Sequence, residues 1–194
     1  MVDQSNARRE DRRATDRSRS VLTAGKIVFD GRDHFCLVRN VSSGGLMIEM
    51  PAPPAAGRRV LVETAGLNPC HATVVWCEER LAGIEFERSQ DVDIICRRGV
   101  SDNGLIVRGP RFRSDRVAEL VAGDRNCVVE VVNISVGGAK LRGVSGLCVN
   151  ALGRLIMGSP MPPLPGNVRW AIGDEIGFRF TEALSRETMA VLLN

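Results

Sequence analysis

The pattern Asn-x-Ser-x-Gly-Gly occurs twice in this chain, and this repeat limits the folds that the chain can adopt. The first copy spans residues 40–45 and the second spans residues 133–138. Each copy separates two short apolar, β-branched stretches, which is typical of two strands joined by a polar corner. We expect the glycines to permit positive φ and to let another molecule approach the backbone closely.

The polar residues of each corner favour a common surface. Asn and Ser two residues apart on a strand point to the same face, so each corner would offer a small polar patch beside a bare backbone. A single copy is more simply interpreted as a turn whose Asn and Ser side chains bond their own backbone. Two copies in matched surroundings favour a functional surface over that interpretation.

The two corners belong to two halves of the chain that match in order and spacing. Trp76 and Trp170 follow the two Asn residues at nearly equal distances, and Gly-x-x-Phe follows each Trp, at residues 83–86 and 177–180. Such a repeat indicates a tandem duplication of one domain. We therefore expect domains at residues 1–98 and 99–194.

Short runs broken by Gly and Pro predict an all-β fold, either barrel or sandwich. A short helix capped by Ser89 is expected after the first half, with Val92 and Ile95 on one face, and a final helix is expected from Ser185. Residues 97–115 are interpreted as a connector. The expected strands are 21–29, 35–41, 46–50, 59–63, 71–77 and 81–86 in the first half, and 116–121, 126–134, 139–141, 147–157, 167–171 and 175–180 in the second.

Arginine is concentrated in an N-terminal arm, residues 1–20, that lacks an apolar face. All but two of the 26 basic residues are Arg, and the net charge is only +3. The positions of the arginines are therefore more informative than the total charge. Such an arm cannot fold alone. We expect residues 8–19 to become ordered over the barrel only when a ligand binds. Arg suits planar, bidentate recognition of phosphates and guanine edges.

These motifs, taken in order, resemble the PilZ domain. The resemblance is carried by Arg13-x-x-x-Arg17, Asn40-x-Ser42-x-x-Gly45, Trp76 and Gly83-x-x-Phe86, and the second half is similar to another PilZ domain. It implies two tandem six-stranded β-barrels, each followed by a short C-terminal helix. It also implies a receptor for the second messenger cyclic di-GMP, with no cofactor, that relays ligand binding to an unidentified protein partner.

The resemblance also implies which residues bind the ligand in the first domain. Arg13 and Arg17 on the arm would contact guanine edges and phosphates, with Arg12 as a supporting contact. The opposing wall would be the corner on the barrel, formed by Asn40, Ser42 and Gly45.

The second copy departs from this pattern. Arg111 and Arg116 share the spacing of Arg12 and Arg17, but Phe112 stands where Arg13 stands. The matching corner residues are Asn133, Ser135 and Gly138. We expect the second domain to bind no ligand or to bind it weakly, and to pack on the first domain or present a surface to a partner.

Other functions fit the sequence less well. Trp76, Trp170, Phe86, Phe178 and Phe180 are interpreted as core residues, which argues against a single-strand nucleic-acid barrel with exposed aromatics. Non-specific nucleic-acid binding by the arm and a PilZ-like scaffold without ligand remain as alternatives. His34 and His71 lie beside no candidate nucleophile, so we expect no enzyme.

The cysteines and the hydropathy complete the prediction. The six cysteines show no C-x-x-C spacing, so they are interpreted as reduced and structural, with no metal site. No apolar run approaches the ~18 residues that span a bilayer, so we expect a cytoplasmic protein without a membrane segment.

Overall fold

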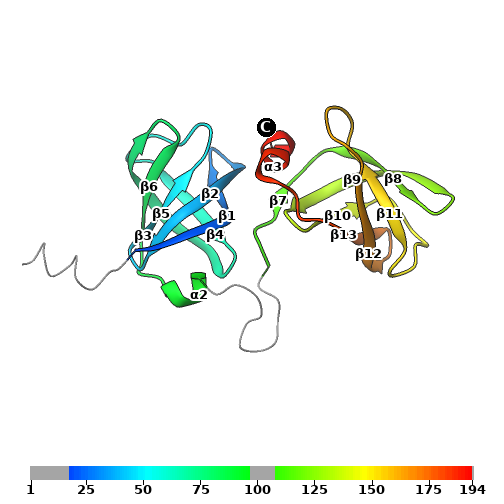
Figure 1. Ribbon diagram of the computed structural model, residues 1–194, viewed down its shortest axis with the longest axis horizontal. Coiled ribbons are helices and arrows are strands. Elements are labelled where there is room, and N and C mark those ends of the chain that lie inside the picture. The colour runs from blue at the N-terminus through cyan, green and yellow to red at the C-terminus, as the bar shows by residue number, and fades with distance from the viewer. Residues whose placement is uncertain (1–17, 97–107, 194) are drawn as a thin grey trace, which may run out of the picture. The chain divides into compact units, whose positions relative to one another are not determined.

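A computed structural model describes residues 18–96 and 108–193 of the chain. The chain divides between Pro110 and Arg111 into two compact units, and each is described by itself (Figure 1). The expected domain boundary after residue 98 lies outside the described residues and stays a prediction.

The first unit is a closed antiparallel barrel, called barrel one, with strand order β1-β2-β3-β6-β5-β4 (Figure 1). A five-residue helix, α2 (Val92–Cys96), follows it. The strands are β1 (Arg19–Phe29), β2 (Arg32–Ser42), β3 (Gly45–Glu49), β4 (Arg59–Thr64), β5 (Leu67–Glu78) and β6 (Leu81–Phe86).

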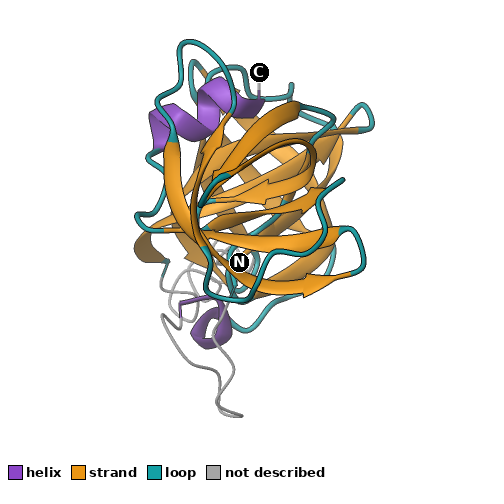
Figure 2. Ribbon diagram, turned by 90° about the vertical axis from the view of Figure 1, so that its right-hand side faces the viewer, coloured by secondary structure: helices purple, strands orange, loops and turns teal. Residues whose placement is uncertain are grey.

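The second unit, barrel two, repeats this topology in the order β8-β9-β10-β13-β12-β11, closed by the pairing of β11 with β8. A short extra strand, β7 (Phe112–Arg113), pairs with β9. The helix α3 (Arg186–Leu193) follows the last strand, and strands dominate the fold (Figure 2). The strands are β8 (Val117–Ala122), β9 (Arg125–Ser135), β10 (Gly138–Arg142), β11 (Leu152–Ile156), β12 (Leu164–Ile172) and β13 (Glu175–Phe180). The predicted fold class, two six-stranded barrels each followed by a short helix, is confirmed.

Alternation of apolar and polar residues along the strands builds each core. Ile27, Val38 and Ile48 are fully buried inside barrel one, and Leu141 and Ile176 are fully buried inside barrel two. Burying a side chain of this size stabilises a fold by roughly 1.5–3 kcal/mol. The period-two alternation of apolar residues in the sequence therefore specifies which side chains form each core.

The expected elements differ from the structure in three places. The strand predicted over residues 147–157 is confirmed only for Leu152–Ile156, because Gly143, Gly146 and Asn150 adopt positive φ and the chain turns until β11 begins at Leu152. Strand β7 lies inside the predicted connector. The cap of α2 is Asp91, which accepts a hydrogen bond from Asp93 N at 2.8 Å, and not Ser89.

The two barrels share their irregularities as well as their topology, which confirms the internal repeat. A bulge interrupts the pairing of β2 with β3 just before Asn40, and the same bulge interrupts β9 and β10 beside Asn133. A second bulge precedes Trp76 in the β5–β6 pair and recurs before Trp170 in the β12–β13 pair. A bulge re-aims the side chains that follow it, so the duplication has kept where these residues point.

We expect Gly138→Ala to destabilise barrel two by about 1–3 kcal/mol, because a Cβ there would lie 2.4 Å from the carbonyl oxygen of Phe178 on the paired strand. Urea unfolding followed by the fluorescence of Trp170, in a Trp76→Phe background, measures this loss.

The adjacent Gly137 is a matched control. A Cβ there meets no atom within 4 Å, so Gly137→Ala should change the free energy of unfolding by less than about 0.5 kcal/mol. Equal effects of the two substitutions would contradict the close-approach explanation.

Candidate functional site

The serine of each corner closes the corner itself. Ser42 Oγ donates to the carbonyl oxygen of Gly45 at 3.4 Å, and Ser135 Oγ donates to that of Gly138 at 3.1 Å. This is the local, turn-forming role of a serine hydroxyl. In both barrels the serine thus holds the shape of the corner, and a ligand would meet a corner that is already formed.

Each corner also holds the chain that leaves the barrel. Gln90 N donates to Ser43 O at 2.8 Å, ahead of α2, and Leu184 N donates to Val136 O at 2.8 Å, ahead of α3. The corner is therefore connected by backbone hydrogen bonds to the segment that follows each barrel.

The last glycine of each corner is needed for space rather than for positive φ. A Cβ on Gly45 would lie 2.1 Å from the carbonyl oxygen of Ile84 on β6, and the φ of Gly45 is not positive. The positive φ that the sequence permits at this glycine is not adopted. Its small size instead lets β3 lie close against β6 at this position.

A tryptophan lies against a second bare glycine beside each corner. A Cβ on Gly83 would lie 2.0 Å from Trp76 Nε1, and a Cβ on Gly177 would lie 2.0 Å from Trp170 Nε1. Each indole therefore covers the outer face of its paired strand, where only glycine leaves room for it.

This placement corrects the interpretation of the tryptophans as core residues. Trp76 is 38% exposed, and Trp170 is only partly buried. The bulge before Trp76 turns both Val75 and Trp76 outward, whereas Val74 is fully buried. The core assignment is confirmed for Phe86, Phe178 and Phe180, which are buried.

The first corner, residues 40–45 and called corner one, lines one hollow of about 480 Å³ together with Trp76 on the outside of barrel one. The predicted residues Asn40, Ser42 and Gly45 all lie in its wall, so the structure brings them together. Asn40 is half-buried there, and among the described residues its amide makes no hydrogen bond to another group. A polar amide and an aromatic face thus border the same space.

Sequence reasoning missed several residues of this hollow. Besides Trp76, the wall contains Met47, Val75, Gly83 and Glu85. The sequence signal for them was the equal spacing of Trp and Gly in the two halves of the chain. A large side chain and a glycine that recur at the same spacing indicate close contact between the two.

The arm residues Arg12, Arg13 and Arg17 lie outside the described residues. Ser18, where the description begins, lines the hollow, so the chain that carries these arginines joins barrel one at the edge of the site. The next residue, Arg19, forms an ion pair with Asp93 of α2 at 2.7 Å.

The electrostatics of the hollow are set by one carboxylate. Glu85 is the single charged residue among those that line it, and the remaining polar groups are neutral. A phosphate-bearing ligand would therefore need its positive counter-charge from a segment other than the described wall.

In barrel two the predicted arginines occupy different places. Arg116 Nε donates to the carbonyl oxygen of Leu192 at 3.1 Å, at the carboxyl end of α3. Arg111 is exposed, one residue before the fully buried Phe112. The residue that pairs directly with Asn133 is Arg113, as Ser20 pairs with Asn40 in barrel one.

The second corner, residues 133–138 and called corner two, keeps the geometry of corner one. Asn133 is half-buried on the outer face of β9, Ser135 closes the corner, and Gly138 lies against β13. By the shared register, however, Arg111 corresponds to Ser18 and Arg116 corresponds to Thr23. A ligand-binding role for Arg111 and Arg116 stays a prediction.

The remaining chemistry is sparse in the described part of the chain. Its residues form no group of three or more potential metal ligands, and none of its helices is long and apolar enough to cross a membrane. All six thiols are free, and burial raises the pKa of Cys36 to about 12. Cys77 and Cys148 are exposed, so the structural interpretation of the cysteines fits Cys36 best.

The comparisons with known proteins agree with this architecture. The PilZ domain matches residues 7–97 and again residues 107–194, so the chain belongs to the PilZ family. No curated protein matches the chain.

Several solved structures are similar over most of their length. The PlzA protein of Borreliella burgdorferi in complex with c-di-GMP is 9% identical, with a TM-score of 0.40 over 98% of this chain and 99% of that one. The MrkH–c-di-GMP complex of K. pneumonia is 15% identical, with a TM-score of 0.34 over 96% and 88%. YcgR of Escherichia coli in complex with c-di-GMP is 13% identical, with a TM-score of 0.34 over 97% and 85%.

We expect Arg116→Ala to lower the stability of barrel two by roughly 1 kcal/mol, because it removes donors from the carbonyl end of α3. Thermal unfolding measured by circular dichroism tests this. Arg125→Ala, at the exposed first residue of β9 in the same barrel, is the control and should leave the melting temperature nearly unchanged. An unchanged melting temperature for Arg116→Ala would mean that this contact contributes nothing.

Proposed function

We propose that the protein is a receptor for cyclic di-GMP and that it binds the nucleotide in the hollow of barrel one. The observation that carries this proposal is the convergence of Asn40 and Ser42 with the exposed face of Trp76 around one space. A neutral polar edge beside an aromatic plane suits a purine, whose edge forms hydrogen bonds and whose face stacks. Membership of the PilZ family supports the same ligand.

The arm supplies what the described hollow lacks. Cyclic di-GMP carries two phosphates, and among the described residues of the wall only Glu85 is charged. Arg19 and Arg39 adjoin wall residues in the sequence, but they form ion pairs with Asp93 and Glu49. Arg12, Arg13 and Arg17 precede Ser18 at the edge of the hollow, so the arm is the proposed source of the positive charge. An Arg fork meets guanine O6 and N7 bidentately, with about 1–3 kcal/mol of discrimination for each such pair.

Energetics favour a ligand-coupled arm. Fixing the backbone of one residue costs about 1–2 kcal/mol, so ordering several arm residues requires strong new contacts. Guanine and phosphate contacts from two arginines, with stacking on Trp76 of about 1–3 kcal/mol, are of the size needed.

The same corner provides a route for relay. Ser43 O accepts from Gln90 N, and Arg19 pairs with Asp93, so both the corner and the base of the arm contact the α2 segment. Ligand binding that shifts the arm or the corner would act on the chain that leads to barrel two. A downstream protein partner would then recognise the altered protein.

Calorimetry with cyclic di-GMP tests the proposed site. We expect Arg13→Ala to weaken binding at least ~10-fold, because each lost bidentate contact is worth about 1–3 kcal/mol. Arg111→Ala, which removes the same charge at the start of barrel two, is the matched control and should leave the affinity unchanged. Absence of heat with the unsubstituted protein at micromolar nucleotide would sink the receptor proposal and favour a ligand-free scaffold.

The two tryptophans allow the site to be located. In a Trp170→Phe variant the only tryptophan is Trp76, and we expect cyclic di-GMP to quench its fluorescence saturably as a guanine stacks on the indole. Binding by calorimetry without any change in this fluorescence would place the nucleotide elsewhere.

A further inference from the structure

The outer face of barrel two carries exposed apolar side chains on neighbouring strands. Val117 on β8, Val128 on β9 and Leu152 on β11 are 65%, 73% and 78% exposed. Strands β9, β8, β11 and β12 are consecutive neighbours in the barrel. Three further apolar residues of these strands alternate with buried residues and therefore point outward. The six residues, called the apolar patch, are Val117, Val121, Val128, Leu152, Ile156 and Pro165.

The strand register makes the apolar patch continuous. Val128 on β9 is diagonal to Val121 on β8, and Val121 is diagonal to both Ile156 and Leu152 on β11. Diagonal neighbours on one face of a sheet lie only roughly 7–8 Å apart, so these side chains border one another. A contiguous exposed apolar surface is typical of an interaction site, whereas single exposed apolar residues are ordinary.

Two opposite charges lie inside the patch. Glu119 lies on β8 and Arg154 lies on β11, and each pairs on both sides with residues of the patch. Glu119 accepts a hydrogen bond from the Asn126 amide. Arg154 is exposed and makes no ion pair within the described part of the chain. The guanidinium group is therefore available to a carboxylate outside barrel two.

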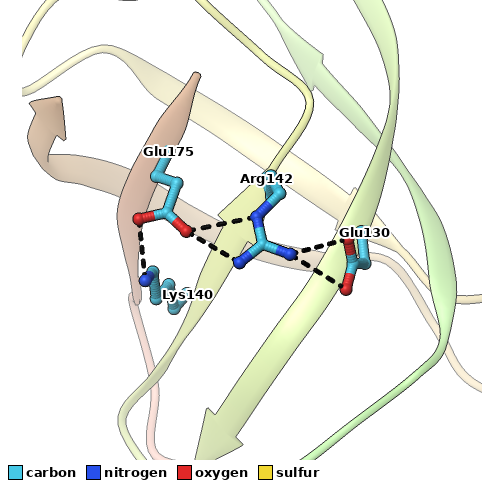
Figure 3. Close-up of polar contacts among 4 residues, drawn as sticks. All are labelled: Glu130, Lys140, Arg142 and Glu175. Carbon is cyan, nitrogen blue, oxygen red and sulfur yellow. Dashed lines mark hydrogen bonds and ion pairs between the residues drawn. The ribbon is translucent and has the colours of Figure 1, made fainter. Parts of the chain in front are cut away.

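A separate network matches the charges at the β9 border of the patch. Arg142 on β10 bridges Glu175 at 3.0 Å and Glu130 at 3.2 Å, and Lys140 lies 2.7 Å from Glu175 (Figure 3). The hydrogen bonds from Lys140 and then Arg142 lower the pKa of Glu175, which keeps it ionised. Glu130, which pairs with Val117 at the edge of the patch, is thus already matched inside barrel two.

Barrel one closes the corresponding position by itself. By the shared register, Glu119 and Ile156 correspond to Lys26 and Glu63 of barrel one. There Lys26 Nζ lies 2.5 Å from Glu63 Oε2, and both side chains are mostly buried. Because Ile156 carries no charge, barrel two has no such ion pair across these two strands. Its face is more apolar, and its carboxylate lies beside an apolar side chain.

The apolar patch is complementary to itself. Strands lie about 4.8 Å apart and residues about 3.4 Å apart along a strand. With these spacings, a two-fold axis in the plane of the sheet, at right angles to the line from Glu119 to Arg154 and through its midpoint, exchanges these two residues. The same axis brings Val128 over Leu152. An isologous dimer requires such a surface, on which each residue meets its complement in the other copy.

We propose that two copies of this chain associate face to face through the apolar patch of barrel two. Glu119 of each copy pairs with Arg154 of the partner subunit, and the apolar side chains around this pair exclude water. A carboxylate and a guanidinium form a strong, directional pair, so the two symmetry-related pairs fix the orientation of the copies.

Sedimentation velocity of the full chain tests this, without nucleotide and with a thiol reductant, since Cys77 and Cys148 are exposed. We expect a concentration-dependent change from the monomer to a species of twice its mass in the micromolar range. A chain that stays a monomer at several hundred micromolar would overturn the proposal. Because no nucleotide is present, this result is independent of cyclic di-GMP binding to barrel one.

Charge reversal identifies the contact. Glu119→Arg and Arg154→Glu should each weaken association at least ~10-fold, because each places like charges together in both symmetry-related pairs. An equimolar mixture of the two variants should dimerise again, since both pairs are then of opposite charge. Docking of the patch on another part of the same chain cannot produce this rescue, and neither can a folding defect. Failure of the mixture to dimerise would contradict the proposed pairing.

The apolar contact has a matched control in the same barrel. Leu152→Glu should weaken association at least ~10-fold, because it places a charge in the water-excluded contact. Ile172→Glu makes the same change in net charge at a side chain that is 74% exposed on β12, outside the patch, and should leave association unchanged. Circular dichroism checks that each variant is folded. Equal effects of the two substitutions, or a dimer that Leu152→Glu leaves intact, would place the contact on another surface.

Discussion

The close approach of a tryptophan to a glycine on the neighbouring strand determines the surface on which the candidate site is built. At both Gly83 and Gly177 a Cβ would collide with the indole, so any other residue would displace the ring. A β-bulge before each tryptophan turns the ring outward onto that bare position. The aromatic face is therefore fixed by packing against backbone, and it is held beside the Asn-containing corner before any ligand arrives. Preorganisation of this kind reduces the cost of binding.

The corner itself combines structure and function in the same residues. Ser42 and Gly45 close the turn and let β3 lie against β6, and the same residues line the hollow. This double role means that an intact motif is no proof of ligand binding, because the fold alone requires it. Asn40 is different, since its amide borders the hollow and makes no hydrogen bond among the described residues. The fold therefore uses the Ser42 hydroxyl and the small size of Gly45, and it leaves the Asn40 amide facing the hollow.

Duplication has conserved geometry more closely than charge. Both barrels keep the serine bond, the close glycines, the tryptophan and the bulges. At the position that faces the last corner glycine, however, barrel one has Glu85 and barrel two has Arg179. Such a change costs little stability on an exposed face but inverts the local potential, which decides the kind of ligand that can approach. The outer faces of the two barrels therefore carry opposite charges at this position on a common scaffold.

The sequence by itself determined the repeat, the all-β class, most strands and the corner residues, because turn chemistry and period-two alternation are local properties. It placed Trp76 in the core and matched Arg111 to the arm, and it could not show Arg113 beside Asn133. Those points depend on bulges, each of which adds one residue and changes the face to which the next side chains point. They also depend on the pairing of β3 with β6 in barrel one and of β7 with β9 in barrel two, which joins strands that are not consecutive in the chain. Only the tertiary structure decides such non-local pairings, because no short stretch of sequence contains both partners.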